Sequence, residues 1–373
     1  MMNRFDRNKI LEDIIQKLDI TPTMYKNAED KYKTLAKYLG ENGLKCDIYP
    51  QGSFSLGTVI RPLKEGKRKE YDLDFICVVY NNESLSPRDF RDKIWNLLIK
   101  NENYSKRIKE YERCFTLEYG EVNGVGFNID VLPAKPHLDN FIFLTNKVDS
   151  NNIEWFKSNP KDYTQWFNSI NNKYPQAEKI NEFNNLLLAK ESVEELPDLF
   201  YRTWLQRVIQ ILKYHRDSFY FSIKKENKKV ISAIITTLCT KIAEKTNFTT
   251  LNTVDLLKYI TSELCSYVKL LSNENLDKRF SDKVVIKKTN CKWEIFNPVN
   301  SEDNLADSWN EDEEKPKLFF KWIMEIRKEF TTESEKEYFT NLLNTFGMEN
   351  LSEDVKKYLG TPEQVTPMKP WRN

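Results

Sequence analysis

The chain has 373 residues, 40% of them hydrophobic and 13% aromatic, which is enough to bury a core in each of two lobes. Its 57 basic and 56 acidic residues leave a formal net charge of +1, which excludes the overall basic field of a protein that holds long nucleic acids. Six cysteines without a Cys-x-x-Cys pair, and only two histidines, argue against a structural zinc site.

The opening of the chain predicts two helices, a strand and a tight turn. Apolar residues recur at helical spacing over residues 4–18, and a second helix is predicted over residues 23–41. The stretch LKCDIYP, residues 44–50, alternates apolar and polar side chains like a short strand. It leads directly into Gly52 and Ser53, a pair of residues typical of a turn.

The strongest strand signal is YDLDFICVVY, residues 71–80. Its alternation places Asp72 and Asp74 on the face opposite to most of its apolar side chains. A helix is predicted after this strand, with Ser86 as its N-cap and Pro87 at its first position.

A hairpin is predicted next, with ERCFTLEYG and GVGFNIDVLPA as its strands. The two strands would turn around Asn123 and Gly124, a dipeptide that favours hairpin turns. In the second strand Asn128 and Asp130 face away from the apolar side chains. Asp130 is therefore the third carboxylate that a sheet could present beside Asp72 and Asp74.

Long helical patterns dominate after about residue 150. LPDLFYRTWLQRVIQILKYHRD, residues 196–217, predicts a long amphipathic helix, and VISAIITTLCTKIAE, residues 230–244, a buried one. The charged residues 311–317 predict a hinge or surface turn before another helix.

These patterns, together with the resemblance that several of the motifs show to a known family, predict an α+β fold of two lobes. Residues 1–150 would form a core of mixed sheet and helices, with the opening helix as a spine along both lobes. Residues 151–360 would form a C-terminal helical lobe that closes a cleft, and residues 361–373 a flexible tail.

Three carboxylates that converge on one sheet would repel one another, and their pKa values would rise. A bound divalent cation removes that cost, and Mg²⁺ prefers a few carboxylates together with phosphate oxygens. Gly52 and Ser53 add a close backbone approach and a hydroxyl donor, which suit a triphosphate. The alternative is that Asp-x-Asp marks an edge strand with a solvated face, and the order and spacing of the motifs favour the metal site.

Several motifs together resemble the polymerase-β-like nucleotidyltransferase superfamily. QGSFSLGTVIRP, EYDLDFICVV and FNIDVLPA match its Gly-Ser loop, Asp-x-Asp strand and distal aspartate. LQRVIQILKYHRD and FNPVNSEDNLADSW extend the resemblance to the bacterial cyclic-oligonucleotide synthases of anti-phage signalling systems (CD-NTases, as in CBASS). The resemblance spans roughly residues 45 to 310.

The resemblance implies a role for each matching residue. Gln51, Gly52 and Ser53 would bind the triphosphate of the donor nucleotide. Asp72, Asp74 and Asp130 would be the catalytic residues that hold two Mg²⁺ ions, which Mn²⁺ can replace.

Two residues of the second lobe match phosphate contacts of the family. These are Lys213 and Ser232, in LKYHRD and VISAII. The alternative is that Lys213 is a solvated lysine on a helix face and that Ser232 is a helix N-cap.

The implied reaction joins nucleoside triphosphates into a cyclic di- or trinucleotide and releases pyrophosphate. One alternative keeps the fold but transfers the nucleotide to an RNA 3′ end, a small molecule or a protein. Another is a non-catalytic nucleotide-binding module, against which the intact set of three aspartates argues.

The expected partners are ATP or GTP, with a pyrimidine nucleotide also possible, and an effector encoded in the same operon. We expect a monomer in the cytoplasm with free thiols, no membrane span and no direct binding of nucleic acid.

Overall fold

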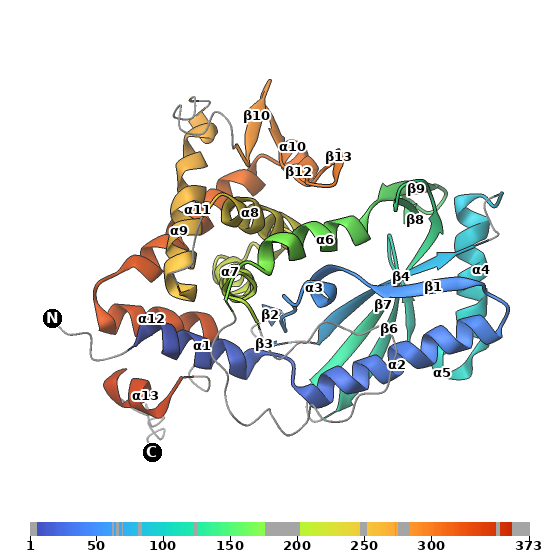
Figure 1. The fold of residues 1–373 in the computed structure, drawn as a ribbon, viewed down its shortest axis with the longest axis horizontal. Helices are drawn as coiled ribbons and strands as arrows, with labels where there is room; N and C mark the ends of the chain where they lie inside the picture. The colour runs from blue at the N-terminus through green and yellow to red at the C-terminus, as the bar shows by residue number, and fades with distance from the viewer. Residues whose placement is uncertain are drawn as a thin grey trace, which may run out of the picture.

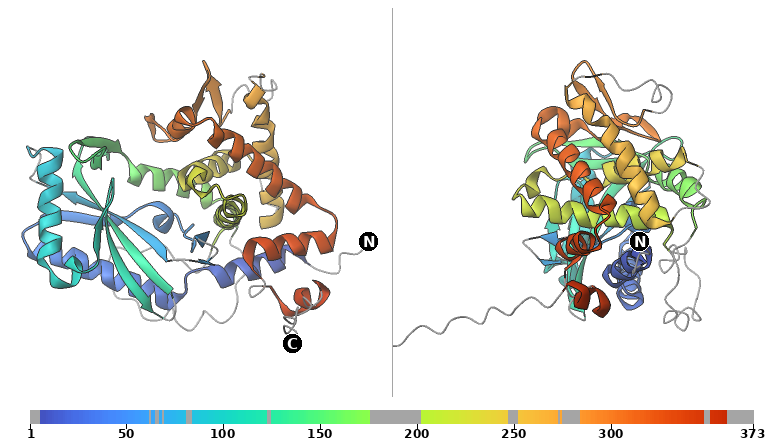
Figure 2. Two further views of the ribbon diagram at one scale, coloured as in Figure 1. Left: turned by 180° about the vertical axis from the view of Figure 1, so that it is seen from behind. Right: turned by 90° about the vertical axis from the view of Figure 1, so that its left-hand side faces the viewer.

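The computed structural model describes residues 6–61, 63–64, 67–68, 70–80, 84–122, 125–175, 202–246, 252–272, 274, 284–347 and 351–359. A sheet with flanking helices lies at one end of the molecule and a helical lobe at the other, as Figure 1 shows. The view from behind in Figure 2 shows the same two parts, joined through α6 and the first two helices.

The α-helices are α1 Arg7–Leu18, α2 Pro22–Glu41, α3 Gly52–Ser55, α4 Pro87–Lys100, α5 Glu102–Ser105, α6 Pro160–Asn171, α7 Trp204–Ser222, α8 Ser232–Glu244, α9 Thr253–Cys265, α10 Asp307–Glu311, α11 Glu314–Thr331, α12 Glu335–Phe346 and α13 Glu353–Leu359. Two 3₁₀ helices are η2 Glu226–Lys228 and η3 Ser266–Ser272. The strands are β1 Cys46–Pro50, β2 Leu63–Lys64, β3 Lys67–Arg68, β4 Tyr71–Val79, β5 Ile108–Glu110, β6 Phe115–Val122, β7 Val125–Pro136, β8 Ile142–Lys147, β9 Ile153–Ser158, β10 Lys287–Thr289, β11 Lys292–Glu294, β12 Phe296–Asn297 and β13 Asn300–Asn304.

The main sheet is mixed. Its strand order is β1-β4-β7-β6-β5, and β8 pairs with the far end of β7 and with β9. β4 and β7 run parallel, whereas the other neighbours in this sheet are antiparallel. The last strand of the sheet, β9, continues to Ser158. The predicted boundary between the two lobes at residue 150 therefore stays a prediction.

The two faces of the sheet differ in chemistry. Leu73, Phe75 and Cys77 of β4 belong to a large buried cluster that also contains apolar residues of α2 and α4. The opposite face carries Asp72 and Asp74 at one end of β4 and a small apolar cluster at the other. The predicted alternation of this strand is confirmed, and it leaves the carboxylates on the face without the main core.

The first two helices form a spine between the lobes. The apolar face of α1 is buried in the core of the helical lobe, whereas α2 packs on the sheet. Figure 1 shows both helices along the base of the molecule, with α1 beside α12 and α2 beneath the sheet. The predicted α+β fold with a C-terminal helical lobe is therefore confirmed.

Most predicted elements are present, with two corrections at helix starts. In the described residues the helix predicted over 196–217 begins at Trp204 behind the N-cap Thr203, while residues 196–201 lie outside the described part. The hinge predicted over residues 311–317 is wrong in its second half, because α11 already begins at Glu314. Pro316 fits there because the first helical turn does not need its missing N–H.

Other predicted features concern the turn, the tail, the thiols and the membrane. The hairpin turn at residues 123–124 and the tail at residues 361–373 lie outside the described part. The six cysteines are all free thiols, as predicted. Of the helices described, none combines the length and the apolar character that a membrane span requires.

Candidate active site

The register of three strands places the polar side chains in two rows. In the first row Asp74 of β4 is paired with Asp130 of β7, which is paired in turn with Thr116 of β6. In the second row Asp72 is paired with Asn128. Because side chains two residues apart point to the same face, the three aspartates lie together on one side of the sheet.

The ionisation of Asp74 is strongly perturbed. Burial raises the pKa of its carboxyl from 3.8 to about 7, and the nearby Asp130 and Asp72 add to the rise. Lys213 acts in the opposite direction but is the weakest of these influences. The sequence-based expectation of repelling carboxylates is thus met at this residue.

The two flanking carboxylates are each held by an uncharged neighbour. Thr116 Oγ1 donates a hydrogen bond of 2.5 Å to Asp130 Oδ1. Asn128 Nδ2 donates one of 3.0 Å to Asp72 Oδ1. These bonds fix the orientation of both carboxylates without placing a positive charge beside them.

The Gly-Ser loop lies directly against Asp74. The backbone N–H of Gln51 donates to the carbonyl of Asp74 at 2.9 Å. Gly52 has φ +61°, and a Cβ at this position would lie only 2.7 Å from Asp74 Oδ2. Glycine is therefore the residue that allows the loop to approach the carboxylate so closely. Ser53 follows it in the short helix α3.

The chemistry of this site fits a divalent cation. Carboxylate oxygens are the donors that Mg²⁺ prefers, and a cation would relieve the repulsion by Asp130 and Asp72 that adds to the effect of burial on the pKa of Asp74. Within the described residues, however, no three Asp, Glu, His or Cys side chains already form a compact metal-binding group. The aspartates share a face, and their side chains would have to turn toward a common ion.

Helix α7 brings its polar side chains to the loop that follows Ser53. Gln206 Nε2 donates to the carbonyl of Leu56 at 2.9 Å, and Gln210 Nε2 donates to that of Val59 at 3.0 Å. The sequence motifs did not identify either glutamine. Their spacing of four positions within a largely apolar helix was the signal in the sequence that could have identified them.

Lys213 continues the same face of α7. Its Nζ donates to the carbonyl oxygen of Thr58 at 3.0 Å and to the hydroxyl of Thr58 at 3.1 Å. The alternative of a solvated lysine is wrong, because the residue is only 2% exposed. Burial and the nearby Arg216 lower the pKa of Lys213 to about 7.

Ser232 is hydrogen-bonded to α7 through Arg216. It is the first residue of α8, whose N-cap is Ile231, so the alternative of a Ser232 N-cap is wrong. Its Oγ accepts a hydrogen bond of 3.0 Å from Arg216 Nη1. Arg216, which the motifs did not identify either, is buried and paired with Asp217 at 2.9 Å.

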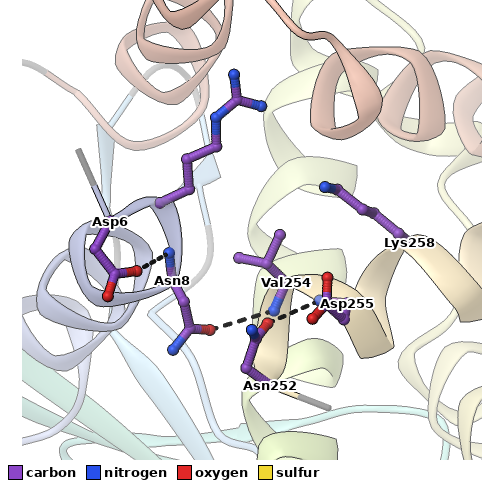
Figure 3. A pocket seen from close by; sticks show the side chains of 7 residues that line it. Asp6, Asn8, Asn252, Val254, Asp255 and Lys258 are labelled. Carbon is purple, nitrogen blue, oxygen red and sulfur yellow. Dashed lines mark hydrogen bonds between the residues drawn. The ribbon is translucent and has the colours of Figure 1, made fainter. Parts of the chain in front are cut away.

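A separate groove of about 380 Å³ lies between the first turns of α1 and α9. Figure 3 shows that Asp6 caps α1 and that Asn252 caps α9, while Asn8 reaches the backbone of Val254. These polar groups already serve the helix ends. The groove is therefore a junction of helices, and the aspartate face remains the candidate site.

Sequence comparison finds related proteins across most of the chain. Residues 6–171 match the family model of the Second Messenger Oligonucleotide or Dinucleotide Synthetase domain (SMODS). A c-di-GMP synthase of Roseivirga ehrenbergii is 28% identical over 331 residues, which cover 86% of this chain and 78% of that protein.

Solved structures with the same fold cover both lobes. The CD-NTase CdnG of Bradyrhizobium diazoefficiens, in complex with GTP, has a TM-score of 0.69 at 16% identity and covers 95% of this chain and 99% of its own. The cyclic AMP-GMP synthase DncV of Vibrio cholerae has a TM-score of 0.55 at 14% identity, covering 95% and 83%. At these identities the likeness shows the fold.

Proposed function

We propose that the chain is one of the bacterial CD-NTases, the polymerase-β-like nucleotidyltransferases that synthesise cyclic oligonucleotides, and that its product is a cyclic di- or trinucleotide. One observation supports placing the active site on this face of the sheet. Asp74 is the cross-strand partner of Asp130, Asp72 lies two residues from Asp74, and the Gly-Ser loop lies against Asp74. A purine nucleoside triphosphate is the proposed substrate. GTP is the first to test, because one relative is a c-di-GMP synthase and the CdnG and DncV structures are complexes with GTP or a nonhydrolysable form of it.

In the proposed reaction a ribose hydroxyl attacks the α-phosphorus of a second nucleotide, and pyrophosphate leaves. Asp72, Asp74 and Asp130 would hold the divalent cations. When bound, such ions neutralise the triphosphate charge and lower the pKa of the attacking hydroxyl. Asp130 is proposed to take part in accepting the hydroxyl proton. The protein thus contributes positioning and charge rather than a covalent intermediate.

Substrate binding is proposed to use both lobes. Gln51, Gly52 and Ser53 would receive the triphosphate from the side of the sheet. Lys213 and Ser232 would receive it from the side of the helical lobe, and the α8 N-terminus adds backbone N–H groups there. The support is that α7 contacts both sides of the proposed site: Lys213 donates to the carbonyl of Thr58 in the loop, and Arg216, one turn further along α7, donates to Ser232 Oγ.

The decisive experiment compares Asp72→Asn with the native chain. All four nucleoside triphosphates are supplied with Mg²⁺ and no other acceptor, pyrophosphate is measured, and products are identified by mass spectrometry. We expect a phosphatase-resistant cyclic product from the native chain and a loss of at least about 100-fold in pyrophosphate release from Asp72→Asn, since metal and charge stabilisation supply several kcal/mol.

The control is Asp354→Asn, which changes an exposed aspartate of α13 and should leave pyrophosphate release intact. Pyrophosphate release by Asp72→Asn at the native rate would overturn the metal-site proposal. A product only after RNA or protein is added would favour transfer to another acceptor. Nucleotide binding without pyrophosphate release would favour the non-catalytic module.

We further propose that the enzyme works in the cytoplasm, where nucleoside triphosphates are abundant, and that a separate effector protein responds to its product. Both proposals rest on the likeness to this family, and so does the proposed role in anti-phage signalling.

A further inference from the structure

Thr116 and Asn128 are uncharged side chains that contact the proposed metal-binding carboxylates and have no assigned role. Thr116 Oγ1 donates to Asp130 Oδ1, and Asn128 Nδ2 donates to Asp72 Oδ1. Asp74 neighbours both carboxylates: it is the cross-strand partner of Asp130 and lies two residues from Asp72 on β4. In the part of the chain that the structure describes, no side-chain hydrogen bond reaches the carboxyl of Asp74.

The strand register makes both contacts possible. Thr116 and Asp130 are directly opposite each other in the antiparallel pair of β6 and β7. Asn128 and Asp72 are partners in the parallel pair of β4 and β7. Both donors are short side chains on hydrogen-bonded strands, and the branched Thr116 has few rotamers. The donor atoms are therefore held by the sheet itself.

An uncharged donor has a specific effect on a metal-binding carboxylate. It occupies one oxygen and favours the ionised form, but it does not neutralise the charge that attracts a cation. A basic side chain at the same place would compete with the ion. Side chains of this kind around metal ligands typically change metal affinity by about 10–100-fold when they are removed.

We infer that Thr116 and Asn128 are positioning residues that decide which oxygens of Asp130 and Asp72 face a divalent cation. This inference rests on the proposed function of the same site. It extends that function to two residues that would act through the carboxylates they contact.

A purely structural role for Thr116 predicts a different outcome. Its side chain is buried, so loss of packing alone would lower stability without a selective effect on metal binding. The test therefore measures metal affinity and stability separately. Thr116→Val keeps the shape and removes the donor, whereas Thr116→Ser keeps the donor and removes one methyl group.

Mn²⁺ alone is titrated into the full chain, and the free ion is followed by electron paramagnetic resonance. We expect about tenfold weaker Mn²⁺ binding for Thr116→Val and for Asn128→Leu, and binding within about threefold of native for Thr116→Ser. The matched control is Thr261→Val, which removes a buried hydroxyl that bonds the Leu257 carbonyl inside α9. Unfolding temperatures are compared in EDTA.

Native Mn²⁺ affinity in Thr116→Val and Asn128→Leu would overturn the inference and leave the proposed function standing. If Thr116→Val does not fold, Asn128→Leu decides by the same criterion. Asp130→Asn tests the underlying site, because native Mn²⁺ binding in this variant would mean that the proposed metal site itself is wrong. The two failures are therefore distinguishable.

Discussion

Asp74 shows how a single residue can lower stability in order to serve a site. Its folded-state pKa is about 7, well above the ordinary value of 3.8, because of burial and the two neighbouring aspartates. Between these two pH values the folded chain binds more protons than the unfolded chain. Stability contributed by this group is therefore present at low pH and is lost as pH rises toward 7.

Asp74→Asn should remove this pH-dependent cost in the metal-free protein. The gain in unfolding free energy over the native chain should grow from pH 4 to pH 7 and then level off, reaching on the order of a few kcal/mol. Thermal unfolding in EDTA at several pH values measures it. The same variant should lose pyrophosphate release. A gain that is equal at pH 4 and pH 8 would show that the raised pKa of Asp74 is not the origin of this cost.

The sequence was sufficient to predict the residues that face out of a regular strand. Asp72, Asp74 and Asp130 follow from alternation along two strands and from the family motif. Thr116 and Asn128 were not assigned, because their contacts depend on which strands are neighbours and in which register. Alternation gives the face of a side chain, whereas register gives its partner.

Among the elements of the fold, the loop after Ser53 contacts both lobes. Phe54 and Val59 are buried in the core of the sheet, whereas Leu56 and Ile60 are buried in the core of the helical lobe. Three side chains of α7, one on each successive turn, donate hydrogen bonds to backbone carbonyl groups of the loop. The position of α7 therefore fixes the loop that approaches Asp74.

Gly57→Ala tests this attachment. Gly57 has φ +64°, and a Cβ there would lie 2.4 Å from Gln206 Nε2 and 2.6 Å from Arg202 Nη1. The matched control is Gly43→Ala, because Gly43 has φ +82° but no atom within 4 Å of the added Cβ. Gly43→Ala should show backbone strain of about 1 kcal/mol, and Gly57→Ala about 1–3 kcal/mol more.

Activity should separate the two glycine variants as well. Gly57→Ala displaces the glutamine that holds the loop, so we expect kcat/KM for nucleotide to fall at least about tenfold. Gly43→Ala, at the end of α2, should keep native kinetics. Chemical denaturation and steady-state pyrophosphate release provide the two measurements. Equal losses in both variants would mean that only backbone strain matters.

Helix α7 also shows where prediction from sequence stops at this scale. Its existence and its apolar stripe were predicted from the spacing of residues such as Leu205 and Leu212. From the pattern alone, a solvated Lys213 on the helix face was the alternative to a phosphate contact, yet both Lys213 and Arg216 are buried. A helix packed on all sides can bury polar groups when another element supplies partners, and no local pattern identifies that element.

On the scale of the whole molecule, α1 and α7 are joined by buried charges. Arg207 of α7 lies 3.3 Å from Glu12 of α1 and 2.5 Å from Asp19, which follows α1. Burial is the main influence on Glu12 and raises the pKa of its carboxyl, while Arg207 opposes that rise. The spine along both lobes was predicted from sequence. The ion pairs that secure it were not, because their members are about 190 residues apart.

Arg207→Met should therefore destabilise the chain by about 3–5 kcal/mol, the range for removing one partner from a buried ion pair. Without the guanidinium, the pKa of Glu12 should rise further. Because a raised folded-state pKa adds stability at low pH that is lost as pH increases, the destabilisation should be larger at pH 8 than at pH 5. The control is Glu302→Gln, which removes an exposed ion pair with Lys157 that also spans the lobes at 3.3 Å. Its unfolding midpoint should match that of the native chain, since solvent screens exposed pairs.

Urea unfolding of both variants at pH 5 and pH 8 provides the measurement. A loss of stability in Arg207→Met that does not depend on pH would show that packing, not charge, joins the spine to α7.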